Sequence, residues 1–146
     1  MDDHRRLLDR IQVEELMSRY TWAIDGQDWE DIAGLVTEDV VADYRNLAGD
    51  DALLNGADEL RGWLEKTLGW RENSLPWHFV SNHVIDLQGD VAQSKHYLHN
   101  RHMTVWGTYF LECRRGPDGW RISKLTLKAI LRREPLPAAP VGPPAA

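Results

Sequence analysis

The chain has little cysteine, no long apolar run and no excess of positive charge, and each shortage excludes a class of protein. Cys113 is the only cysteine, so disulfides within the chain cannot hold the fold, and we expect a reduced structural thiol. The net charge of −6 argues against a nucleic-acid partner, whose phosphates attract a basic surface. No apolar run approaches the roughly 20 residues that cross a bilayer, so we expect no membrane association.

Two further shortages concern location and cofactors. The start of the chain, MDDHRRLLDR, is charged and lacks the apolar core of a secretory signal. With a single cysteine this favours a cytoplasmic protein. No cofactor motif is recognisable along the chain, so we expect chemistry that needs no cofactor.

The 146 residues suit one domain, which we place at residues 1–133. The remainder, 134–146, is rich in proline and alanine, lacks periodicity, and is expected to be disordered. Seven tryptophans are many for this length and suggest an aromatic-lined core, pocket or interface.

Apolar spacing predicts three helices followed by a run of strands, which is an α+β order. Three- and four-residue spacing predicts helices over residues 4–24, 29–36 and 57–70. Asp28 is expected to cap the second helix. A short strand is predicted over 39–44, a loop over 45–56, and long strands over 77–87, 91–103, 105–115 and 119–131. A strongly curved, mostly antiparallel sheet around three helices would form a cone with one open mouth.

Four ionisable residues on separate apolar segments form the candidate catalytic set: Asp25, Tyr44, His78 and His96. An acid, a phenol and two imidazoles that converge in an apolar pocket could perform general acid–base catalysis. Strand alternation places His78 and His83 on opposite faces unless a bulge intervenes, and we expect His83 to face outward.

Four stretches of the chain resemble a known family: YTWAIDGQDWEDIAGLVTEDVVADYRN, WHFVSNHVID, DVAQSKHYLHNRH and DGWRISKLTLK. They are similar to the SnoaL-like branch of the nuclear transport factor 2-like (NTF2-like) superfamily, which includes scytalone dehydratase and the bacterial bile-acid dehydratases. The resemblance implies a cone-shaped α+β barrel with the active site inside it.

The resemblance also implies roles for the candidate residues. In scytalone dehydratase a carboxylate at the place of Asp25 orients a histidine at the place of His96, and a second histidine, at the place of His78, lies across the cavity. A tyrosine at the place of Tyr44 helps to hold a water that polarises the substrate carbonyl.

One position departs from that pattern. Ile24 stands where scytalone dehydratase has its second water-holding tyrosine. Tyr20, five residues before Asp25, instead resembles the arrangement of the bile-acid dehydratases. Carbonyl activation is therefore expected to involve Tyr20.

The function that these expectations favour is a cofactor-independent dehydratase acting on a hydroxylated cyclic carbonyl compound, such as a polyketide or steroid. The same pocket could instead serve a polyketide cyclase, a ketosteroid-type isomerase or a binding module without catalysis, because one fold hosts many functions. The sequence does not decide which of the two histidines is the base. Candidate substrate-binding residues are Asn82, Trp106, Thr108 and Tyr109.

Two expectations concern metals and partners. His96 and His102 share a strand face, but no cysteine or glutamate completes a familiar ligand spacing, so we predict no metal site. The outer face of an open sheet needs cover, so we predict a homodimer or homotrimer. In the resembled superfamily such assemblies usually pack through the sheet.

Overall fold

The computed structural model describes residues 3–69 and 77–131, which form four helices and one six-stranded sheet. The helices are α1 (Asp3–Gly26), α2 (Trp29–Leu35), α3 (Arg45–Ala48) and α4 (Ala57–Leu68). The strands are β1 (Val36–Asp43), β2 (Leu53–Asn55), β3 (His78–Gln88), β4 (Val91–Asn100), β5 (Val105–Gly116) and β6 (Gly119–Leu131). The α+β class predicted from the sequence is confirmed. The tail predicted at 134–146 and residue 70 of the third predicted helix lie outside the described residues.

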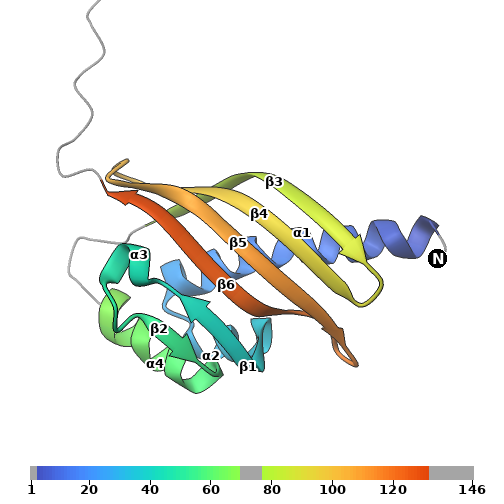
Figure 1. Cartoon of the computed structure of the whole chain (residues 1–146), viewed down its shortest axis with the longest axis horizontal. Coiled ribbons are helices and arrows are strands. Elements are labelled where there is room, and N and C mark those ends of the chain that lie inside the picture. The colour runs from blue at the N-terminus through green and yellow to red at the C-terminus, as the bar shows by residue number, and fades with distance from the viewer. Residues whose placement is uncertain (1–2, 70–76, 132–146) are drawn as a thin grey trace, which may run out of the picture.

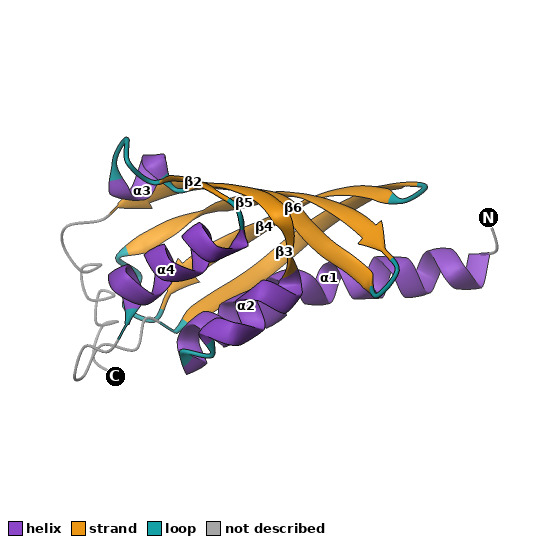
Figure 2. Cartoon of the chain, turned by 90° about the horizontal axis from the view of Figure 1, so that it is seen from below, coloured by secondary structure: helices purple, strands orange, loops and turns teal. Residues whose placement is uncertain are grey.

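The sheet is mixed, curved and not closed. Its strand order is β2-β1-β6-β5-β4-β3, in which β1 and β6 run parallel and every other pair is antiparallel. Helices α1, α2 and α4 lie on one face of the sheet (Figures 1 and 2). The predicted arrangement of helices against a curved, mostly antiparallel sheet is confirmed.

The segment predicted as a loop, 45–56, contains the one-turn helix α3 and the three-residue strand β2. Such short elements are too brief for a repeating apolar pattern to reveal them. Asp28 lies at the N-cap position of α2 as predicted, but its side chain makes no capping hydrogen bond.

The core lies between α1 and the inner face of the sheet. On α1 the buried side chains recur at helical spacing: Val13, Leu16, Met17, Tyr20 and Ile24. On β4 every second residue is buried, from Ala92 through Ser94 and His96 to Leu98. This alternation defines the inner and outer faces of the sheet.

A β-bulge in β3 changes which residues face inward. The pairing of β3 with β4 shifts register between Ser81 and Val84, and Asn82 adopts a left-handed φ of 52°. Because of the extra residue, His83 lies on the inner face with its ring centroid 6.1 Å from that of His96. The expectation that His83 faces outward is wrong, and the bulge is the physical reason.

The N-terminal half of α1 is fixed to the sheet by a buried carboxylate. Asp9 accepts hydrogen bonds from Arg115 Nη2 at 2.7 Å and from the indole Nε1 of Trp120 at 3.0 Å. Arg115 and Trp120 flank the β5–β6 turn. The contact therefore joins the second turn of α1 to the end of the sheet at which that turn lies. Beyond it, the first turns of α1 extend past the sheet (Figure 1).

Among the described helices, none is both long enough and apolar enough to span a bilayer.

Candidate active site

The end of α1 and the start of β3 hold an aspartate and a histidine together through two hydrogen bonds. Asp25 Oδ1 lies 2.7 Å from His78 Nδ1, and Asp25 Oδ2 accepts the backbone N–H of His78 at 2.8 Å. A carboxylate only accepts hydrogen bonds, so Nδ1 carries the hydrogen, and in the neutral ring Nε2 has the lone pair. The contact fixes both the orientation and the tautomer of the ring.

This pair lies in the wall of a cavity of about 520 Å³ between α1 and β3. The side chain of Asp25 is 17% exposed and that of His78 is 12% exposed, so both are largely shielded from water yet reachable. Such a setting strengthens electrostatic interactions with a bound molecule.

Three buried tyrosines form a second cluster on the inner face. The hydroxyls of Tyr20 and Tyr44 lie 2.7 Å apart, and the ring of Tyr109 stands edge-on to that of Tyr44 with centroids 6.4 Å apart. Trp63 from α4 stacks on the Tyr44 ring at 4.9 Å, which fixes its position from the other side. One of the paired hydroxyls donates to the other, so the second hydrogen remains available to another acceptor.

Burial keeps these phenols protonated. It raises the pKa of Tyr109 to about 12. A hydrogen bond to Tyr44 lowers this pKa in part, and the negative charge of Asp25 raises it by a smaller amount. Burial likewise raises the pKa values of Tyr20 and Tyr44 well above their usual range. Asp25 thus contributes to the pKa of Tyr109, but none of the three tyrosines is among the residues that line the cavity beside Asp25 and His78.

His96 does not contact Asp25, and the predicted pairing of these two residues is wrong. Its Nε2 lies 3.0 Å from the hydroxyl of Ser94, and its nearest described ring is that of His83, whose Nε2 lies 3.3 Å from Glu14. The resemblance led to the wrong partner for Asp25 because β3, which carries His78, is the strand that lies against the end of α1.

The two histidines differ in their surroundings. Burial lowers the pKa of His96 to about 4, with a further decrease from the neighbouring His83. His96 is therefore neutral at physiological pH and resists protonation. His78, by contrast, has the Asp25 carboxylate 2.7 Å from its Nδ1.

The candidate substrate-binding residues divide between the two faces of the sheet. Tyr109 is buried on the inner face in the tyrosine cluster. Thr108 and Trp106 alternate with it and lie on the outer face, where the Trp106 indole donates to the carbonyl of Met103. Asn82 occupies the bulge and is exposed. The structure therefore does not bring these three residues to the Asp25–His78 pair.

Sequence reasoning missed two features of this region. Trp22, which the sequence did not single out, is exposed and lines the cavity beside Asp25. Its position three residues before Asp25 on a helix could have revealed this. His83 was missed because only the bulge brings it inward.

Within residues 3–69 and 77–131, no group of three or more histidine, cysteine, aspartate or glutamate side chains could hold a metal ion.

The fold and this region define a class: an α+β domain in which helices cover one face of a curved sheet and a hydrogen-bonded aspartate and histidine lie where α1 meets β3. The SnoaL-like domain model matches residues 5–126, and the chain belongs to this family. A search of curated protein sequences found no match.

Solved structures share the fold at low sequence identity. LinA is 17% identical, with a TM-score of 0.78 over 99% of this chain and 100% of its own. A protein from Novosphingobium aromaticivorans DSM 12444, provisionally assigned as a scytalone dehydratase, is 21% identical, with a TM-score of 0.75 over 98% and 99% of the two chains. Kfla4162 from Kribbella flavida is 22% identical, with a TM-score of 0.74 over 85% and 92%.

Proposed function

We propose that this protein is a cofactor-independent dehydratase that acts on a hydroxylated cyclic carbonyl compound, such as a polyketide or steroid. The observation that carries the proposal is the doubly hydrogen-bonded Asp25–His78 pair in the wall of a cavity. Membership of the SnoaL-like family and likeness to a provisionally assigned scytalone dehydratase support it.

In the proposed reaction His78 is the base and then the acid. Its Nε2 takes the proton from the carbon next to the carbonyl, and Asp25 stabilises the imidazolium that forms. The bond from the β-carbon to the hydroxyl oxygen then breaks, and the same proton goes to the departing hydroxyl. The products are an unsaturated carbonyl compound and one water, so atoms and charge balance.

The tyrosine cluster is proposed to stabilise the negative charge that develops on the carbonyl oxygen. Burial keeps Tyr20, Tyr44 and Tyr109 as neutral O–H donors, and donors fixed before the reaction stabilise an oxyanion most effectively. The neutral His96 is proposed to act as a further inner polar group rather than as the base.

The experiment is incubation with a panel of cyclic β-hydroxyketones, followed by mass spectrometry. The proposal expects a product lighter by one water, formed by the wild type and not by Asp25→Asn. A product of unchanged mass would instead indicate cyclisation or isomerisation by the same pair. Binding without any product would indicate a binding module.

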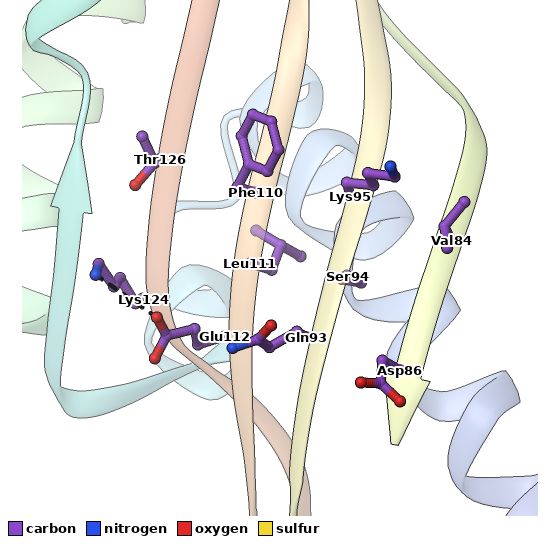
Figure 3. Close-up of a pocket in the computed structure, with 10 residues that line it drawn as sticks. All are labelled: Val84, Asp86, Gln93, Ser94, Lys95, Phe110, Leu111, Glu112, Lys124 and Thr126. Atoms are coloured by element: carbon purple, nitrogen blue, oxygen red, sulfur yellow. Dashed lines mark ion pairs between the residues drawn. The ribbon is translucent and has the colours of Figure 1, made fainter. Parts of the chain in front are cut away.

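We also propose that copies of the chain associate through the outer face of the sheet, as a homodimer or homotrimer. That face carries exposed Val84, Tyr97 and Phe110, and a groove of about 370 Å³ runs across it. Figure 3 shows Phe110 and Lys95 projecting from this face and the Lys124–Glu112 ion pair at its side.

The association is tested by analytical ultracentrifugation of Tyr97→Asp, with Leu7→Asp as a control. Tyr97 and Leu7 are similarly exposed, but only Tyr97 lies on the outer face of the sheet. The proposal expects the first change to shift the protein to monomers and the second to leave its assembly intact. A monomeric wild type would refute it.

A further inference from the structure

The sequence after β6 carries prolines at a regular spacing. Residues 132–146 read RREPLPAAPVGPPAA, in which Pro137, Pro140 and Pro143 stand at every third position. A polyproline II helix has three residues per turn, so in that conformation these three prolines would lie along one edge, which we call the proline edge. Such a helix makes no internal hydrogen bonds, and its carbonyl groups therefore remain free to accept hydrogen bonds from a partner surface.

The outer face of the sheet has a groove beside the end of β6, which we call the terminal groove. Its volume is about 710 Å³, and its lining residues extend from β6 to β3. Most of the side chains that line it form two rows of cross-strand neighbours: Ile130, Trp106 and His99 in one row, and Lys128, Thr108 and Tyr97 in the other.

The terminal groove presents apolar and aromatic surface to solvent. Ile130 is 74% exposed, Tyr97 58% and Trp106 38%. The indole Nε1 of Trp106 donates a hydrogen bond to the carbonyl of Met103 at 2.7 Å, which fixes the ring in place. A ring that is already fixed loses little conformational freedom when another group packs on it, so this wall is prepared for a partner.

Hydrogen-bond donors border the same groove. Asn46 Oδ1 accepts the backbone N–H of Ala129 at 2.6 Å, which leaves the side-chain NH2 group of Asn46 as a donor. The Tyr97 hydroxyl and the Lys128 ammonium group also lie at the groove. Proline-rich segments in the polyproline II conformation dock in aromatic-lined grooves, and these donors can pair with the carbonyl groups of such a segment.

We propose that residues 137–143 dock through the proline edge in the terminal groove of the same chain, with residues 132–136 as the connection. From β6 to β3 there are three strand spacings, or about 14 Å. Between Pro137 and Pro143 a polyproline II helix extends about 19 Å, which is enough to cross the groove. Five connecting residues reach up to about 17 Å, which is enough to turn the chain from the end of β6 onto the groove.

The position of this segment in the chain favours it over a second copy as the occupant. It follows directly after β6, whose Ile130 lines the groove. A tethered segment is present at an effective concentration on the order of millimolar, so weak contacts suffice to hold it. A segment that lacks a core of its own can become ordered on such a surface. The groove around Val84 and Phe110, proposed for association between copies, shares no lining residue with the terminal groove.

The test measures backbone order in the full-length chain by 15N relaxation of the amides that lie between the prolines: Ala138, Ala139, Val141 and Gly142. In the wild type we expect order parameters of about 0.85, because a docked segment moves with the sheet. Loss of docking should lower them below about 0.6. Values below about 0.6 in the wild type would overturn the proposal.

Two pairs of variants separate docking from composition and from general surface change. Pro140→Ala combined with Pro143→Ala removes two prolines of the proline edge, whereas Pro135→Ala combined with Pro144→Ala removes two prolines outside it. Only the first pair should lower the order parameters.

On the sheet, Ile130→Asn should lower the order parameters and Val84→Asn should not. Both residues are β-branched and exposed, at 74% and 54%, but only Ile130 lines the terminal groove. Equal order in each variant and its control would show that the proline edge does not use this groove.

Nuclear Overhauser effects locate the docked segment. Contacts between the Pro140 ring and the Trp106 indole support the terminal groove. Contacts with Trp22 or Trp77 instead would place the segment at the cavity beside Asp25 and overturn the proposal. In mixtures of labelled and unlabelled protein, contacts found only between chains would overturn it in favour of segments exchanged between copies.

Discussion

Helix α1 carries a hydrogen-bonded carboxylate near each end, and the two have partners of different chemistry. Asp9 is held by Arg115 and by the indole of Trp120, in a closed contact at the far end of the sheet. Asp25 is held by the ring and backbone of His78, in the wall of a cavity. Arginine does not release its proton in proteins, whereas histidine exchanges one near neutral pH. One end of the helix is therefore suited to stability and the other to proton transfer.

The largest expected effect is on the reaction at the Asp25 end. Asp25→Asn and His78→Gln should each lower kcat by about 10³-fold or more, because both the tautomer and the charge of the imidazolium depend on the pair. The measurement is the initial rate of water loss from a substrate found in the β-hydroxyketone panel. His96→Gln serves as the comparison and should lose far less. Rates of Asp25→Asn within a factor of a few of the wild type would remove Asp25 from the mechanism.

At the Asp9 end the expected effect is on folding. Asp9→Asn leaves Arg115 without its buried anion and should destabilise the fold by roughly 3 kcal/mol. Urea denaturation followed by circular dichroism measures the change. Below the transition the variant should keep the catalytic rate of the wild type.

A matched control for this change is Asp39→Asn, which breaks the solvent-exposed pair with Arg114. Exposed ion pairs contribute little, so this variant should unfold like the wild type. Equal stability of Asp9→Asn and Asp39→Asn would show that the buried contact has no special weight.

A smaller effect is expected from pH, through His96. Its pKa is about 4 in the folded protein and about 6.5 when exposed, so between these values the unfolded chain binds a proton that the folded chain does not. The contribution of neutral His96 to the free energy of unfolding is therefore complete above about pH 6.5. It is lost as the pH falls toward 4 and amounts to at most about 3 kcal/mol.

His96→Gln removes this titration and tests it. The difference in unfolding free energy between pH 7.5 and pH 4.5 should be smaller in the variant than in the wild type, because the carboxylates contribute equally to both proteins. Identical pH dependence would show that His96 titrates normally in the folded state.

The smallest effect is expected from the tyrosine cluster. Tyr44→Phe removes one of two paired hydroxyls and leaves Tyr20 as a donor, so kcat should fall by about 10- to 100-fold. Stability should change little, since the ring still stacks on Trp63. An unchanged rate would show that the cluster supports the fold and not the reaction.

Local patterns predicted the fold because they act over short distances. Helical spacing of apolar residues located α1 and α4, and alternation of apolar and polar residues located the four long strands. On β4 and β5 alternate residues are buried, and these mark the inner face of the sheet. Elements of three or four residues, such as α3 and β2, carry no such pattern and were missed.

The site was predicted only in part, because its geometry depends on contacts between distant segments. Asp25, His78 and the tyrosines were identified as residues, yet the partner of Asp25 was assigned to the wrong histidine. Strand alternation could not place His83, since a single extra residue at the bulge reverses the facing of everything after it. The Asp9 contact joins residues more than 100 positions apart, so no local pattern reveals it.

The most direct test of the account is proton NMR of the imidazole N–H groups at low temperature. A hydrogen bond from Nδ1 of His78 to Asp25 should give a strongly downfield resonance that is lost in both Asp25→Asn and His78→Gln. It should persist in Asp9→Asn and His96→Gln. A downfield resonance that instead vanishes in His96→Gln and survives in His78→Gln would contradict the pairing on which the proposed chemistry depends.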